Sequence, residues 1–284
     1  MKYKKIDPKT NDMVTVYHLM ISAIAPRPIA LVGSKDKNNV DNLAPFSFFN
    51  GFGANPPIVG FSPALSGRTG LPKDTLLNIR ETSEFTISIV TKDIIEQVSL
   101  SSCEYPRGID EFSMTGLSKF KTELISSPGV KESPVIMECK LVDIIELGNL
   151  PASGNLILGE IVLLHINERI LNKDNKIDSE KINHIGRSGK NWYVESNKAM
   201  FEIIKPKGVG VGFDSLPLEL INSNLTGNQL AKMASITAIP KIKKNINLVG
   251  CDINDVIDTI SQTLNSNDIE GAWQIILNWK INNE

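Results

Sequence analysis

Residues 62–75 combine hydroxyl, glycine and basic residues in a pattern that suits a phosphate group. Arg68 and Lys73 supply two positive charges, and a helix is predicted to begin directly after the segment. Free N–H groups and the positive end of the helix dipole favour an anion at such a position, and Lys73 would add a point charge. The simpler interpretation is that Asp74 or Thr75 only caps the helix, and the segment alone leaves both open.

A second segment, residues 42–50, mixes small and polar residues with aromatic ones at the end of a predicted strand. Its backbone N–H groups, the Ser47 hydroxyl and the Asn42 amide are able to line one edge of a flat ligand. An equal alternative is a strand end whose aromatic side chains belong to the core.

Residues 184–193 form a third candidate, in which Arg187 lies between glycines and is followed by Trp192 and Tyr193. An arginine and aromatic rings on a loop of this kind can clamp a phosphate or cover a ring. Taken by itself, the segment is better explained as an exposed turn.

Other familiar motifs are incomplete. Residues 208–212 lack the third glycine of a dinucleotide-binding loop, and Pro217 follows where its helix would run. The histidines His18, His165 and His184 form no HExxH pair, so no local pattern predicts a metal site. No Gly-x-Ser-x-Gly sequence is present, which disfavours an α/β-hydrolase.

The elements that must position these segments are mostly strands over the first two-thirds of the chain. Alternating or continuous apolar runs predict strands near residues 29–33, 40–44, 58–61, 85–89, 135–141 and 156–166. Short helices are expected near residues 75–81 and 93–100. Because the regular βαβ rhythm of a doubly wound sheet is missing, we expect a mainly β fold, a small barrel with flanking helices.

The pattern changes near residue 200. Apolar residues from Ile253 to Leu264 follow a helical spacing behind a possible N-cap, Asp252, and a second amphipathic helix is predicted near residues 269–280. Residues 230–234 indicate a weaker third helix. We therefore expect a mainly β domain over residues 1–200 and a mainly helical extension over residues 201–284.

Composition excludes several classes of protein. The 284 residues include 30 basic and 32 acidic ones, a net charge of −2, which argues against nucleic acid as the main partner. No apolar run approaches the ~20 residues of a membrane helix, and none follows the first lysines as in a signal peptide. Three widely spaced cysteines suit a reducing compartment. We expect a cytoplasmic protein without a membrane or nucleic-acid partner.

Several of these segments occur in an order that one family shares. They are residues 26–30 (PRPIA), 42–47 (NLAPFS), 73–75 with Asn78 and Ile79, 108–112 (GIDEF), 158–162 (LGEIV) and 186–193. Together they resemble the flavin reductase-like, FMN-binding split-barrel family, which includes flavoredoxin. The resemblance covers roughly residues 15–195. Residues 212–214 and 225–228 resemble an extension that some members carry at the C-terminus.

The resemblance implies a six-stranded antiparallel split barrel that forms a homodimer with FMN near the subunit interface. The residues that would line the isoalloxazine are Asn42, Ala44, Pro45, Phe46, Ser47 and Phe48. Those that would hold the ribityl chain and phosphate are Ser62, Lys73, Asp74 and Thr75, with Asn78 close by. Arg187 would approach from the far side of the barrel or from the partner subunit, and Arg27 would lie beside the ring.

The resemblance also implies three functions. The favoured one is an FMN-dependent flavin reductase that passes hydride from NADH or NADPH to flavin N5, as the reductase partner of a monooxygenase. The alternatives are a flavoredoxin-type electron carrier with tightly bound FMN and a split-barrel binding protein without activity. Hydride transfer needs orientation and exclusion of water rather than an acid or base, so no catalytic residue is predicted.

Overall fold

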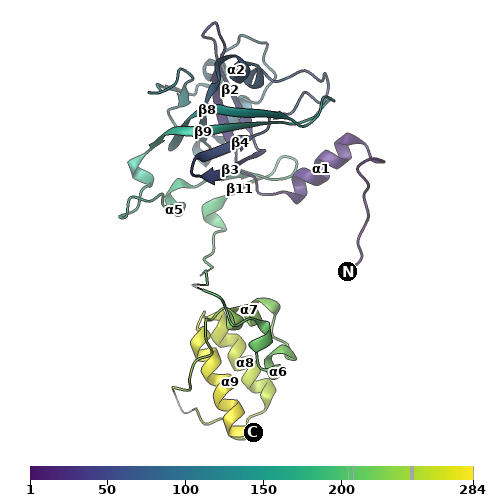
Figure 1. Ribbon diagram of the computed structural model, residues 1–284, viewed down its shortest axis with the longest axis vertical. Coiled ribbons are helices and arrows are strands. Elements are labelled where there is room, and N and C mark those ends of the chain that lie inside the picture. The colour runs from purple at the N-terminus through teal and green to yellow at the C-terminus, as the bar shows by residue number, and fades with distance from the viewer. Residues whose placement is uncertain (204, 207, 244–245, 284) are drawn as a thin grey trace. The chain divides into compact units, whose positions relative to one another are not determined.

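The computed structural model describes residues 1–203, 205–206, 208–243 and 246–283, and the chain separates into two compact units, Met1–Met200 and Phe201–Glu284 (Figure 1). The strands of the first unit are β1 (Ala30–Lys35), β2 (Asp41–Phe46), β3 (Phe49–Ala54), β4 (Pro57–Phe61), β5 (Glu84–Ile89), β6 (Lys119–Phe120), β7 (Gly129–Val130), β8 (Val135–Glu146), β9 (Asn155–Ile166), β10 (Ile185–Arg187) and β11 (Tyr193–Glu195). Its helices are α1 (Met13–Ala23), α2 (Asp74–Thr82), α3 (Ile95–Leu100), α4 (Glu111–Thr115) and α5 (Ser179–Ile182), with 3₁₀ turns at Lys92–Ile94, Glu168–Ile170 and Ser196–Lys198.

Seven strands form one antiparallel sheet in the order β2-β1-β5-β8-β9-β4-β3, where the family resemblance implies six. Its two edge strands, β2 and β3, are separated in the chain only by Ser47 and Phe48. An extended residue spans at most ~3.6 Å, so this short link brings the two edges of the sheet close together. The sheet therefore curls into an open barrel, as expected for a split barrel.

Successive residues of β1 point to opposite faces of the sheet and join two different cores. Ala30 and Val32 belong to the core inside the barrel, together with Leu76 of α2. Leu31 belongs to a core on the other face, which includes Phe112 of α4. The edge strand β2 contacts both helices, so the fold brings the starts of α2 and α4 to one edge of the sheet.

Residues 42–46 of the predicted segment 42–50 lie inside β2 rather than in a loop. Pro45 is within this strand, directly opposite Leu31 of β1. Proline cannot donate to a sheet ladder and is tolerated in an edge strand, which is the position that β2 has. The segment thus offers the outer edge of a strand to a ligand.

The second unit is helical. Its elements are a 3₁₀ turn at Phe213–Ser215, α6 (Leu218–Ile221), α7 (Gly227–Ala234), α8 (Ile253–Asn265) and α9 (Ile269–Asn283). Asp252 caps α8 as predicted, because its carboxylate accepts the N–H of Asn254. The fully buried Trp273 lies in the core of this unit, and its indole Nε1 donates to the Met233 carbonyl at 3.0 Å.

A stripe of amide side chains on α9 binds backbone groups of Lys243 and Ile246, which precede α8 in the chain. The Gln274 Oε1 accepts the N–H of Lys243 at 2.8 Å, and the Asn278 Oδ1 accepts that of Ile246 at 3.1 Å. One turn further on, the Asn282 Nδ2 donates to the Ile246 carbonyl at 3.0 Å. These contacts satisfy backbone groups outside regular structure, and they explain why polar Gln274 and Asn278 are buried in α9.

Candidate functional site

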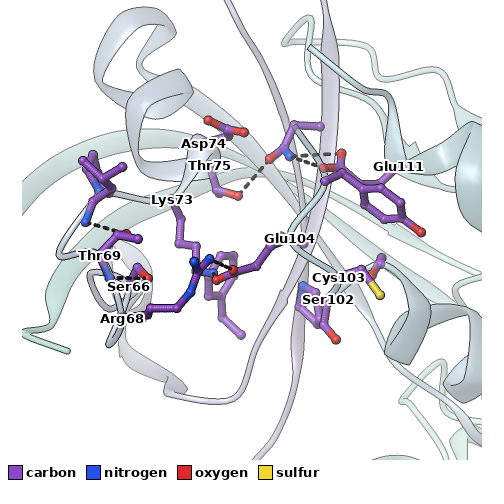
Figure 2. Close-up of a pocket in the computed structure, with 18 residues that line it drawn as sticks. Ser66, Arg68, Thr69, Lys73, Asp74, Thr75, Ser102, Cys103, Glu104 and Glu111 are labelled. Atoms are coloured by element: carbon purple, nitrogen blue, oxygen red, sulfur yellow. Dashed lines mark hydrogen bonds and ion pairs between the residues drawn. The ribbon is translucent and has the colours of Figure 1, made fainter. Parts of the chain in front are cut away.

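A pocket of about 320 Å³ opens beside the edge strand β2 (Figure 2). Its walls come from β2, from residues 66–72, from the start of α2 and from residues 101–105, which follow α3. Ala44 and Phe46 of β2 contribute apolar surface, whereas the rest of the wall is rich in hydroxyl and charged groups. This size, with apolar walls and a few converging polar groups, is typical of a small-molecule site.

Two basic side chains converge on one carboxylate in this pocket. The Arg68 Nη2 lies 2.9 Å from one oxygen of Glu104, and the Lys73 Nζ lies 3.3 Å from the other (Figure 2). The hydrogen bonds from Arg68 and Lys73 hold the pKa of the Glu104 carboxyl below its usual value. Two positive charges therefore meet one carboxylate at this end of the pocket, which leaves a net charge of +1 among the three side chains.

Helix α2 begins at the same end. Lys73 is its N-cap residue, and no side chain among the described residues caps it. The Asp74 carboxylate pairs with Arg107 at 2.9 Å, and the Thr75 hydroxyl donates to the Asn42 Oδ1 at 2.8 Å. Neither side chain caps the helix. The Leu76 N–H already donates to the Lys73 carbonyl at 3.0 Å, so the Asp74 and Thr75 N–H groups and the helix dipole are what the start of α2 offers to an anion.

The side-chain amide of Asn42 connects three elements behind the pocket wall. Its Nδ2 donates to both carboxylate oxygens of Glu111 at 3.0 Å, and its Oδ1 accepts from Thr75 and, at 3.1 Å, from Ser34. The Asn78 Nδ2 donates to Ser34 at 3.2 Å. All five side chains are buried, so the Asn42 amide is committed to joining its own strand, β2, to three other elements, β1, α2 and α4.

Burial of Glu111 gives the fold a specific pH dependence. Loss of solvent raises the pKa of its carboxyl, although hydrogen bonds from the Leu43 N–H at 2.9 Å and from Asn42 oppose the shift. An acid whose pKa is higher in the folded state binds more protons there. Its contribution to the free energy of unfolding therefore grows as the pH falls through the folded pKa toward the unfolded value of ~4.3.

We expect Glu111→Gln to remove this contribution. The wild-type protein should gain stability relative to the variant as the pH is lowered through the raised pKa of Glu111 toward the unfolded value of ~4.3. Urea denaturation of both proteins at each pH measures the difference, in which the titrations of the other groups cancel. A difference that does not change with pH would contradict this assignment.

The pocket brings together residues that the sequence placed in two separate segments. Those of the predicted cofactor contacts that line it are Asn42, Ala44, Pro45, Phe46, Lys73, Asp74 and Thr75. Asn78 lies further along α2, where it is buried and accepts a hydrogen bond from Arg107 at 3.3 Å. Both segments singled out by their chemistry, 42–50 and 62–75, thus contribute to one site.

Arg27, Ser47 and Phe48 lie elsewhere. The Arg27 guanidinium donates to the carbonyls of Ile21 and Ile24 at the end of α1, and to the Ser47 hydroxyl at 3.3 Å. Its Cζ lies 5.9 Å from the centre of the Phe48 ring. Arg27 is 5% exposed, and its donors tie α1 to the end of β2. A place for Arg27 beside the flavin ring stays a prediction.

Ser62 and Arg187 are also engaged outside the pocket. The Ser62 hydroxyl accepts the N–H of Asn155 at 3.1 Å, which joins the end of β4 to the start of β9. The Arg187 guanidinium lies 4.5 Å from the centre of the Tyr193 ring, its partner in the β10–β11 ladder. An approach of Arg187 to a site on a partner subunit stays a prediction.

Several pocket residues were not predicted as cofactor contacts. They are Ser66, Arg68, Thr69, Leu71, Pro72, Ser101, Ser102, Cys103, Glu104, Tyr105 and Glu111. The first five belong to the segment whose chemistry was recognised, and Glu111 belongs to the GIDEF motif. Nothing in the sequence marks residues 101–105, because only the packing of α3 against the sheet brings them to the pocket.

The chain belongs to the flavin reductase-like domain family. The family profile, described as "Flavin reductase like domain", matches residues 22–179, more than half of the chain. A relative from Halalkalibacterium halodurans is 35% identical over 193 residues, which cover 66% of this chain and 90% of that one. The predicted family is confirmed.

Solved structures with a similar fold include the following two. Nitrilotriacetate monooxygenase component B from Bacillus cereus is 32% identical with a TM-score of 0.67, and the match covers 72% of this chain and all of that chain. A Shewanella frigidimarina protein with a split barrel domain is 27% identical with a TM-score of 0.62, over 72% of this chain and 99% of that one. The predicted split-barrel fold is confirmed.

Two further properties concern the described part of the chain. Its histidine, cysteine and acidic side chains nowhere gather in a group of three or more that could hold a metal ion. None of its helices is both long and apolar enough to cross a bilayer.

Proposed function

We propose that the protein is an FMN-binding oxidoreductase that takes hydride from NADH or NADPH. The observation that carries this proposal is the pocket beside β2, in which Arg68, Lys73 and the start of α2 lie at one end and Ala44 and Phe46 supply apolar surface. The first group suits a phosphate and the second suits a flat ring. Membership of the flavin reductase-like family supports the same ligand.

The residues of the chain would bind and orient the cofactor. Arg68 and Lys73, with the N–H groups of Asp74 and Thr75 at the start of α2, would hold the phosphate. Pro45 and its neighbours on β2 would lie along the ring. Bound FMN supplies the hydride acceptor. The protein then contributes orientation and exclusion of water, for which no acid or base is required.

Replacing Lys73 with glutamine is expected to weaken FMN binding about 10-fold and to leave riboflavin binding unchanged, because riboflavin lacks the phosphate. A hydrogen bond to a charged group contributes ~1.5–3 kcal/mol, and partial exposure of Lys73 favours the lower end. Quenching of flavin fluorescence measures both affinities. Lys140→Gln, which removes an exposed charge on β8, is the control; equal losses for both flavins would argue against a phosphate site.

The reductase and the two alternatives differ in what happens after FMN is added. Visible absorption after desalting reports retained FMN, and anaerobic addition of NADH or NADPH reports its reduction. Continuous consumption of free flavin would indicate a reductase, whereas reduction of tightly held FMN without turnover would indicate an electron carrier. A colourless protein that neither binds nor consumes flavin would indicate the binding protein without activity.

We also propose that the protein is a cytoplasmic homodimer that supplies reduced flavin to a monooxygenase. The support is the resemblance to nitrilotriacetate monooxygenase component B, together with free Cys103, Cys139 and Cys251, which suit a reducing compartment. Sedimentation equilibrium measures the subunit number. Stimulation of a flavin-dependent monooxygenase by the purified protein and NADH tests the transfer of flavin.

A further inference from the structure

The two cations of the pocket are already paired with an internal carboxylate. Glu104, in the segment after α3, gives one oxygen to Arg68 at 2.9 Å and the other to Lys73 at 3.3 Å (Figure 2). The Arg68 side chain is 78% exposed, that of Lys73 41% and that of Glu104 54%. Ion pairs this exposed contribute little to the stability of the fold. A stabilising role therefore does not explain why Arg68 and Lys73 both pair with Glu104.

A carboxylate and a phosphate compete for the same partners. Both accept charge-assisted hydrogen bonds from arginine and lysine through oxygens that share a negative charge. The two oxygens of Glu104 contact the two side chains that the proposed function assigns to the FMN phosphate. If Glu104 stayed in place, its charge would repel the phosphate. The phosphate can therefore bind Arg68 and Lys73 fully only when Glu104 has moved away.

We propose that Glu104 is a built-in competitor of the flavin phosphate, and that it makes FMN an exchanging ligand. The inference rests on the proposed function and adds how the same pocket releases its cofactor. A competitor attached to the chain acts at a high effective concentration, so it rebinds the cations as soon as the phosphate leaves. This favours a reductase that exchanges free flavin over a carrier that retains FMN.

Glu104→Gln in the full-length protein tests the competition. The variant should bind FMN about 3- to 10-fold more tightly and release it more slowly, whereas riboflavin affinity should not change. Fluorescence quenching gives the two affinities, and stopped-flow mixing with excess riboflavin gives the FMN dissociation rate. Glu104→Ala removes the carboxylate altogether and should act in the same direction.

A matched control removes an equal charge nearby. Glu96 lies on α3 and is exposed, and Glu96→Gln should change neither affinity by more than about 2-fold. Weaker FMN binding by both Glu104 variants would show that Glu104 positions the cations. An unchanged ratio of FMN to riboflavin affinity would show that Glu104 does not compete with the phosphate. Either result would overturn this inference and leave the proposed function standing. If neither the wild type nor the variants bind any flavin, the proposed function fails and the inference fails with it.

Discussion

Replacing Trp273 with alanine is expected to destabilise the helical unit by about 3–5 kcal/mol, the usual cost of removing a large aromatic side chain from a core. Trp273 is fully buried in the cluster that α7, α8 and α9 share. The substitution leaves a cavity, and it also removes the indole donor of the Met233 carbonyl. A unit of this size has little stability to spare, so we expect it to be largely unfolded in the variant.

The loss of stability should stay within residues 201–284. Among the described residues, the hydrophobic core of the helical unit shares no member with the three cores of the first unit. Hydrogen exchange should show lost protection in α7–α9 and unchanged protection in β5 and β8. Trp192→Ala is the matched control, since Trp192 is 74% exposed, and it should change the free energy of unfolding by less than about 0.5 kcal/mol. Lost protection in the sheet would show that the two units unfold together.

Most strands and the long C-terminal helices could be predicted because their apolar periodicity is local. Residues 253–264 are helical behind Asp252. The predicted hairpin forms between β1 and β2, in which Ala30–Lys35 pairs with Asp41–Phe46. Strand β3 and helix α1 were not predicted, because their sequences show no clear alternation of apolar and polar residues. Strand β3 is the seventh strand of the sheet, and the other six were predicted.

The site was predictable where one segment carries its own chemistry. Residues 62–75 hold both cations and the helix start, so the segment alone suggested an anion site and left simple capping of the helix as the alternative. The partners of these groups come from distant segments. Glu104 meets Lys73 only through the packing of α3, and Arg27 has its donors committed to α1, which no spacing in the sequence reveals.

Replacing Asn42 with alanine is expected to lower the free energy of unfolding of the barrel by about 2–4 kcal/mol. The substitution removes the amide that donates to the buried Glu111 carboxylate. Of the β2 donors to this carboxylate, only the Leu43 N–H is left. The substitution also removes the acceptor of the Thr75 hydroxyl, which holds the start of α2. Folded molecules of the variant should therefore bind FMN more weakly. Urea denaturation and FMN titration measure the two effects.

Asn42→Asp distinguishes loss of the hydrogen-bond network from loss of packing, because it keeps the shape of the side chain. It places a second carboxylate against Glu111, and repulsion raises the pKa of the pair in the folded state. The pair then binds more protons when folded, so this variant should regain stability as the pH falls, whereas Asn42→Ala should not regain it to the same extent. Asn38→Ala, in the exposed β1–β2 turn, is the control and should cost less than about 0.5 kcal/mol. A loss in Asn42→Ala with no loss in Asn42→Asp at any pH would mean that Asn42 stabilises the barrel by filling space, and that the start of α2 is held by other contacts.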